Sequence, residues 1–96
     1  MNYEQVINSA PKVLVEFYAS WCPHCQRMMP IVADVKEKEE GKVAVYQYDV
    51  DKYAELTDAN GVESYPTFIL YKNGEEVWRS AGEMPESALL SELRKY

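Results

Sequence analysis

The sequence predicts a single α/β domain with a central mixed sheet of about four strands between layers of helices. Residues 12–18 (KVLVEFY) are apolar on both faces apart from Glu16, which is typical of a strand covered by helices on each side. Strand and helix patterns alternate around this segment, as they do in βαβ units. Further on, Lys72-Asn73-Gly74 separates two strand-like runs, and Asn-Gly in that place is the strongest short hairpin signal.

The first half of the chain predicts a helix, a strand and a second helix. Asn2 and Gln5 fit a variant capping box that opens a short helix to about Ser9, and Pro11 closes it. After the strand at 12–18, a helix should run from the two cysteines to about residue 39, with Pro30 kinking it. Its apolar face is formed by Cys25, Met28, Met29, Val32 and Val35.

The second half predicts a strand, a helix, the hairpin and a last helix. Residues 43–49 (VAVYQYD) form the strand, and Asp51 is expected to cap a helix that runs to about residue 60 and stops at Gly61. The hairpin strands are 67–71 and 75–80. Pro85 then begins a helix that buries three leucines, Leu89, Leu90 and Leu93.

Composition restricts the classes of protein that fit. Ninety-six residues suffice for one hydrophobic core but not two, so we expect one domain over residues 1–96. The net charge is −6 and no basic run is present, which disfavours nucleic acids and anionic membrane surfaces as partners. No apolar run exceeds four residues, far below the roughly 20 residues of a membrane span. The N-terminus lacks the pattern of a signal peptide, so we expect the cytoplasm, or the periplasm if a leader had been removed.

The segment ASWCPHCQ, residues 19–26, contains both cysteines and the only histidine of the chain. Cys22 directly follows the buried strand and would lie at a helix N-terminus, where free N–H groups and the helix dipole stabilise a thiolate. Cys25 would lie one turn deeper on the same face, close enough to form a disulfide with Cys22. A zinc site needs about four ligands, which the chain does not supply, and a structural disulfide over so short a loop stabilises little. The spacing C-x-x-C beside a βαβ pattern favours a redox pair.

Several motifs resemble those of the thioredoxin family. Residues 15–30 (VEFYASWCPHCQRMMP) are similar to its active-site segment, which usually reads W-C-G-P-C with a proline five residues later, here Pro30. Residues 64–67 (SYPT) resemble the family's cis-proline loop, residues 72–74 its last hairpin turn, and Gly82 a glycine that lines its substrate groove. The match runs without gaps from about residue 12 to the end. It implies the thioredoxin fold with the family's first strand missing.

The resemblance implies a role for each matched residue. Cys22 would be the nucleophile and Cys25 the resolving thiol, with a Cys22–Cys25 disulfide in the oxidised protein. Pro66 would be cis, and an extended polypeptide would pair with the backbone of Tyr65. The exposed rim of this surface would be formed by Trp21, Pro23, Tyr65, Pro66, Ala81 and Gly82. The resemblance implies no metal and no organic cofactor, because the dithiol itself carries the electrons.

Three departures from the family pattern bear on function. His24 lies between the cysteines, and its imidazole or imidazolium should stabilise the Cys22 thiolate and make the disulfide a better oxidant. Glu16 stands where thioredoxins have a buried aspartate, and Gln47 where they have a lysine. We expect Glu16 to accept the proton of Cys25 during resolution, the alternative being a side chain that reaches solvent at the sheet edge. Without the first strand, residues 43–49 become an exposed edge, so we expect a monomer or a weak edge-strand dimer.

The sequence therefore predicts a thiol–disulfide oxidoreductase that reduces protein disulfides and receives electrons from a reductase partner. His24 supports an alternative, a disulfide oxidase or isomerase. A redox-silent module that only binds polypeptides is a third candidate, and the retention of both cysteines argues against it.

Overall fold

The computed structural model describes all 96 residues and has the predicted order of elements. Helices and strands alternate up to the C-terminal hairpin, which a last helix follows. The elements are α1 (Tyr3–Ile7), β1 (Lys12–Tyr18), α2 (Pro23–Lys38), β2 (Ala44–Asp49), α3 (Ala54–Ala59), β3 (Thr67–Lys72), β4 (Glu75–Ala81) and α4 (Glu86–Leu93).

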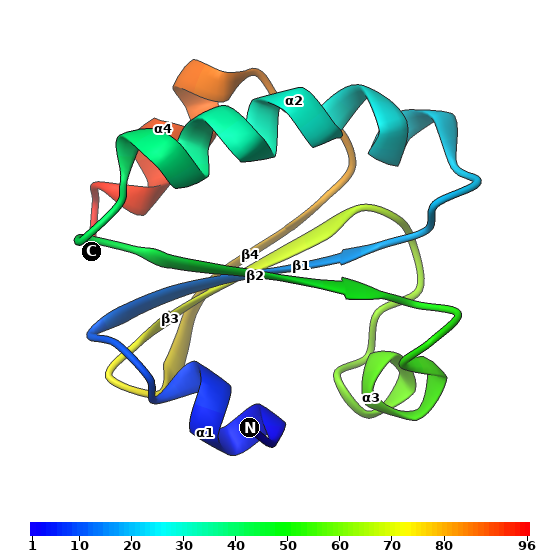
Figure 1. The fold of residues 1–96 in the computed structure, drawn as a ribbon, viewed down its shortest axis with the longest axis horizontal. Coiled ribbons are helices and arrows are strands. Elements are labelled where there is room, and N and C mark those ends of the chain that lie inside the picture. The colour runs from blue at the N-terminus through cyan, green and yellow to red at the C-terminus, as the bar shows by residue number, and fades with distance from the viewer.

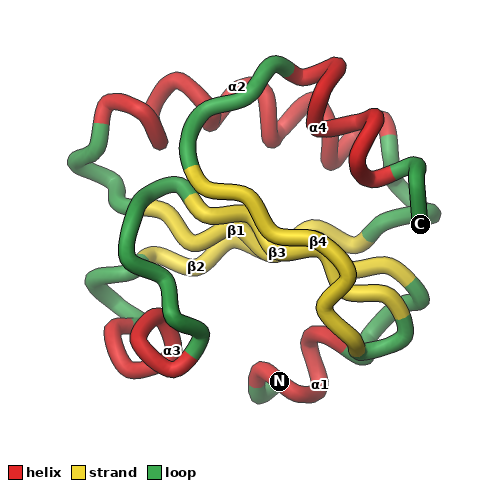
Figure 2. The backbone as a smooth tube through the Cα atoms, turned by 180° about the vertical axis from the view of Figure 1, so that it is seen from behind, coloured by secondary structure: helices red, strands yellow, loops and turns green.

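The sheet has four strands in the order β2-β1-β3-β4, and β2 forms one edge as predicted. β1 runs parallel to β2 and antiparallel to β3, which pairs antiparallel with β4. Helices α2 and α4 cover one face of the sheet and α1 and α3 the other (Figure 1), an arrangement that is also clear from behind (Figure 2). Because β1 is a central strand with helices on both faces, residues 13–17 are completely buried.

The two local signals at the chain's first helix and its hairpin are confirmed. Asn2 accepts a hydrogen bond from the backbone N–H of Gln5 at 2.8 Å, and its own N–H donates to the Gln5 side chain at 2.9 Å. The helix ends at Ile7, slightly before the predicted Ser9. Asn73 and Gly74 have φ values of 51° and 83°, the left-handed pair that a two-residue hairpin turn requires.

Two sequence predictions about helices are wrong. Asp51 does not cap α3, which begins at Ala54 with Tyr53 at the N-cap position and no side-chain cap. The Asp51 carboxylate instead accepts a hydrogen bond from the indole N–H of Trp21 at 2.9 Å. Met29 was placed on the buried face of α2 but is 44% exposed. It borders a hollow beside Cys25, whereas the other four residues of that face are buried.

Two glutamates are buried, and they differ in their partners. Glu39, at the end of α2, accepts a hydrogen bond from the Arg94 guanidinium at 3.0 Å. Glu16, in the middle of β1, has no cation beside it and only one hydrogen-bond donor. None of the four helices combines the length and apolar character needed to cross a bilayer.

Candidate active site

The two cysteines lie where β1 passes into α2. Cys22 is the N-cap residue of α2 and Pro23 the first residue of the helix, where the fixed φ of proline is suited and its missing N–H costs nothing. Cys25 is one turn deeper and fully buried, and Cys22 is 8% exposed. Both are free thiols, so the Cys22–Cys25 disulfide of the oxidised protein stays a prediction. The backbone N–H of Ala19 donates to the Cys25 sulfur at 3.4 Å.

The surroundings of the two thiols shift their pKa values in opposite directions. The backbone N–H of Cys25 lowers the pKa of Cys22, and the N–H of His24 and the charge of Arg27 lower it further against the effect of partial burial. Burial raises the pKa of the Cys25 thiol to about 11. Cys22 is therefore the sulfur that ionises first, and Cys25 needs a base to lose its proton.

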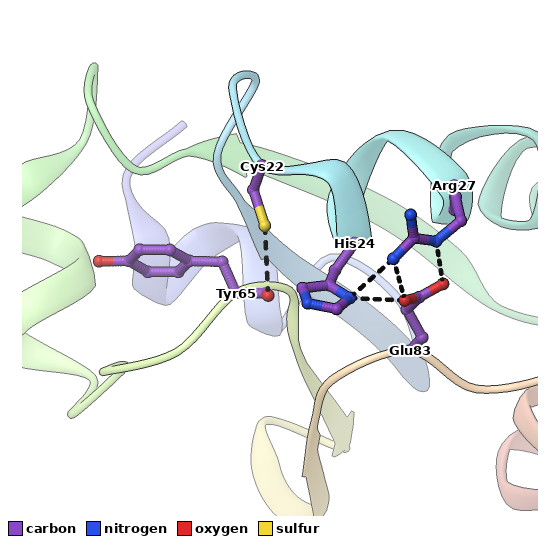
Figure 3. Close-up of polar contacts among 5 residues, drawn as sticks. All are labelled: Cys22, His24, Arg27, Tyr65 and Glu83. Atoms are coloured by element: carbon purple, nitrogen blue, oxygen red, sulfur yellow. Dashed lines mark hydrogen bonds and ion pairs between the residues drawn. The ribbon is translucent and has the colours of Figure 1, made fainter.

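The loop before β3 lies directly against Cys22. The Cys22 thiol donates a hydrogen bond to the Tyr65 carbonyl at 3.8 Å (Figure 3). The Tyr65–Pro66 peptide bond is cis, as the resemblance implies. The backbone N–H of Tyr65 makes no hydrogen bond within the chain, so it is available to an incoming strand. The backbone N–H of Gly82 donates to the Pro66 carbonyl at 2.8 Å and ties the end of β4 to this loop.

The predicted rim is exposed only in part. Trp21 is 62% exposed, and its ring meets that of Tyr65 edge-on at 6.2 Å between centroids. Pro23 and Ala81 are also exposed, and Gly82 is half-buried like Tyr65. Pro66, which we expected on the exposed rim, is buried instead. Its ring lies beneath the surface that its neighbours form.

Glu16 is fully buried, so the alternative in which its side chain reaches solvent is wrong. β1 is a central strand, and Glu16 lies opposite Gln47 of β2 in the parallel register. The Gln47 amide donates to Glu16 Oε1 at 2.9 Å, and Oε2 has no partner. Burial raises the pKa of the Glu16 carboxyl, which outweighs the opposite effect of the Gln47 hydrogen bond. The negative charge of Glu16 in turn contributes to the raised pKa of Cys25.

The His24 side chain makes no hydrogen bond to the Cys22 sulfur, which pairs with the Tyr65 carbonyl. Its Nδ1 lies 2.5 Å from a carboxylate oxygen of Glu83, and Arg27 donates two hydrogen bonds to the same carboxylate at 2.8 and 2.7 Å (Figure 3). Arg27 and Glu83 belong to the site, although no motif in the sequence singled them out. The available signal was weak: Glu83 follows Gly82, and Arg27 lies one helical turn after His24. No three side chains of the His, Cys, Asp and Glu types lie close enough together to hold a metal ion.

Two thiols that ionise so differently, facing a loop with a free backbone N–H, are suited to dithiol–disulfide exchange, and this defines the class as thiol–disulfide oxidoreductases. The family model described as thioredoxin matches residues 1–95. A chloroplastic thioredoxin Y from Oryza sativa subsp. japonica is 37% identical over 93 residues, covering 96% of this chain and 55% of that protein. A thioredoxin from Synechocystis is 36% identical, covering 97% and 87%.

Solved structures agree with this. A mutant thioredoxin from Halobacterium salinarum superposes with a TM-score of 0.90 at 35% identity, over 97% of this chain and 80% of that one. Plasmodium falciparum thioredoxin gives 0.88 at 33% identity, over 98% and 90%. The chain belongs to the thioredoxin family and has the C-x-x-C pair of a thioredoxin-type thiol–disulfide oxidoreductase. It spans about half the length of the chloroplastic relatives and most of the bacterial one.

Proposed function

We propose that this chain reduces disulfides in extended protein segments, with Cys22 as the nucleophile and Cys25 as the resolving thiol. The observation that carries the proposal is the contact between the Cys22 thiol and the Tyr65 carbonyl. It places the sulfur that ionises first next to a backbone edge with a free N–H. A substrate strand that pairs with Tyr65 by β-augmentation would bring its own disulfide to Cys22.

The first step is attack by the Cys22 thiolate on one sulfur of the substrate disulfide. The substrate S–S bond breaks, a Cys22–substrate disulfide forms, and the leaving sulfur departs as a thiolate that takes a proton from solvent. The lowered pKa of Cys22 supports this role because only the thiolate attacks. Trp21 and Pro23 would border the substrate on one side, and Ala81 and Gly82 on the other.

In the second step, Cys25 resolves the mixed disulfide. With a pKa of about 11, its thiol needs a base, and we assign this role to the Glu16 carboxylate, acting through water. The raised pKa of Glu16 supports the assignment, because a carboxylate with a higher pKa accepts a proton more readily. The Cys25 thiolate attacks Cys22, the substrate leaves as its second thiolate, and Cys22–Cys25 becomes the disulfide. Two electrons have then passed to the substrate.

A reductase partner must return two electrons to the Cys22–Cys25 disulfide for a second turnover. We place the protein in a reducing compartment, the cytoplasm, because protein thiols are kept reduced there. No further cofactor enters this cycle, because the dithiol holds both electrons.

Insulin reduction and disulfide trapping test the proposal. The wild-type protein should reduce insulin with dithiothreitol as electron source, and Cys25→Ser should accumulate mixed disulfides through Cys22. Cys22→Ser is the matched control and should trap nothing. No turnover by the wild type would leave the redox-silent binding module as the better reading, and equal trapping by the two variants would overturn the assignment of nucleophile and resolving thiol.

His24 favours the second candidate, an oxidase or isomerase, so its effect needs its own measurement. Equilibrating the Cys22–Cys25 pair with glutathione gives its reduction potential, which separates a reductase from an oxidase. His24→Gly should make the pair more reducing, because the thiolate of the reduced form loses a stabilising group. An unchanged potential would show that His24 does not tune the thiolate.

A further inference from the structure

A cluster of three ionisable side chains lies beside the active site, and none of them is a cysteine. His24 and Arg27 come from the first turns of α2, and Glu83 comes from the segment between β4 and α4. Arg27 binds Glu83 in a bidentate pair through Nε and Nη2, at 2.8 and 2.7 Å. The Glu83 carboxylate therefore binds the Arg27 guanidinium and the His24 imidazole at the same time (Figure 3).

The short contact between His24 and Glu83 fixes the position of a proton. Nδ1 of His24 lies 2.5 Å from Glu83 Oε2 and 3.0 Å from Arg27 Nη2. A carboxylate only accepts hydrogen bonds, and two acceptors at 2.5 Å would repel each other, so we assign a proton to Nδ1. That N–H points to Glu83, whereas the Cys22 thiol points to the Tyr65 carbonyl. The Nδ1 proton of His24 is therefore engaged by Glu83 and is not available to the Cys22 sulfur, and His24 contributes to the lowered pKa of Cys22 through its backbone N–H.

The balance of charge in this cluster bears directly on Cys22. The positive charge of Arg27 lowers the pKa of Cys22, and Glu83 is the carboxylate with which Arg27 forms its ion pair. Arg27, followed by His24, lowers the pKa of Glu83 to about 2, so the carboxylate is ionised at neutral pH. An ionised Glu83 offsets the charge of Arg27 and repels a thiolate at Cys22. Both effects make the reduced form less favourable than it would be with the charge of Arg27 alone.

We propose that Glu83 is a positioning residue that keeps the Cys22–Cys25 pair reducing, by orienting the His24 imidazole and offsetting the charge of Arg27. A C-P-H-C tetrapeptide can then serve a reductase, because a carboxylate from another segment binds both the His24 imidazole and the Arg27 guanidinium, whose charge would otherwise stabilise the Cys22 thiolate. The inference rests on the redox role of the pair that is proposed above.

The test compares the glutathione equilibrium constants of Glu83→Gln and Arg27→Gln with that of the wild type. Glu83→Gln removes the negative charge and should make the pair more oxidising, whereas Arg27→Gln should make it more reducing. Single exposed charges shift an equilibrium by about twofold to fivefold, and Glu83→Gln both removes a repelling charge and leaves Arg27 without its counter-charge, so we expect about tenfold for Glu83→Gln. Tenfold corresponds to about 30 mV for this two-electron couple. The double variant should lie close to the wild type, because the two charges cancel.

Glu76→Gln is the matched control. Glu76 forms the same bidentate pair with Arg79, at 3.0 and 2.8 Å, but near the opposite end of β4. This variant should leave the equilibrium constant unchanged, and the thiolate absorbance of Cys22 should titrate at lower pH in Glu83→Gln only.

The outcomes separate this inference from the proposed function. A wild-type pair that reduces insulin but shows equal equilibrium constants in Glu83→Gln and Glu76→Gln would overturn the role of Glu83 alone. A Cys22–Cys25 pair that becomes more reducing in Glu83→Gln would also overturn the role of Glu83. A wild-type pair that neither equilibrates with glutathione nor reduces insulin would overturn both proposals.

Discussion

Replacing Glu16 with leucine should make the protein more stable and its resolving step slower. The carboxyl is fully buried in the central strand, and its Oε2 has no hydrogen-bond partner. Leu14 and Glu16 are two positions apart on β1, so their side chains lie on the same face of the sheet, the face that α2 covers. Leu14 packs there in the apolar core. A leucine at position 16 would extend that core. The Gln47 amide would lose its acceptor, but Gln47 is exposed and water can replace it.

The size of the gain follows from the unpaired oxygen. A buried polar atom without a partner costs about 1–3 kcal/mol, so Glu16→Leu should raise the free energy of unfolding by about that amount at neutral pH. For a domain of this size, each kcal/mol raises Tm by about 4–8 °C. In the same variant the mixed disulfide should decay about 100-fold more slowly or worse, because Cys25 loses its base.

The gain should depend on pH in a defined direction. Burial raises the pKa of Glu16 above its ordinary value of 4.5, so the folded protein keeps the proton at pH values where the unfolded chain has released it. Wild-type stability therefore falls as the pH rises from 4.5 towards the folded-state pKa, and the leucine variant is spared this loss. The gain in stability from Glu16→Leu should therefore be larger at pH 8 than at pH 4.

Urea denaturation at both pH values measures the effect, with Glu39→Leu as the control. Glu39 is also buried, but Arg94 is its partner, so its replacement should bring no gain. A Glu16→Leu protein that is no more stable than the wild type at pH 8, or that gains as much at pH 4, would refute the reasoning. An unchanged rate of resolution would refute the role of Glu16 as the base.

Three further predictions follow from other parts of the structure. In the reduced protein, alkylation of Cys22 should reach half its maximal rate below pH 9.0 and that of Cys25 only near pH 11, and a common midpoint would contradict the separate pKa values. Gly74→Ala should destabilise the fold by about 1–2 kcal/mol in urea, because φ is 83° and a Cβ would lie 2.2 Å from Asn8 Oδ1; unchanged stability would contradict this. Sedimentation velocity should show weak, concentration-dependent self-association through β2, and a strict monomer at high concentration would exclude it.

The parts of the fold that were predicted correctly depend on neighbours in the sequence. The capping box of Asn2 and Gln5, the Asn73-Gly74 turn and the apolar run of β1 are all decided within a few residues. The prediction that Asp51 caps α3 was wrong because a distant residue, and not a neighbour in the sequence, decides where the Asp51 side chain binds. Asp51 has the right residue type for a cap, but its carboxylate is taken by the indole N–H of Trp21, which is 30 positions away in the chain.

In the active site, too, the local motif was predicted correctly and the contact between distant residues was not. The position of the two cysteines follows from a motif of four residues, and both lie where it predicts them. The bond between Arg27 and Glu83 joins residues 56 positions apart, and no local pattern indicates it. Met29 occupies a helical position at the flank of the predicted face, where periodicity alone cannot tell a buried side chain from one beside a hollow.

The hydrogen bond from the Gly82 N–H to the Pro66 carbonyl joins the loop that contacts Cys22 to the loop that follows β4. One loop carries the backbone edge at Tyr65, and the other leads directly to Glu83. Since the folded chain has already ordered both, a substrate segment would meet a preorganised surface and only its own backbone would lose conformational entropy. A substrate segment can then bind briefly to this surface through only a few contacts. A reductase that serves many different protein disulfides benefits from such a surface, because release of each product is as necessary as its capture.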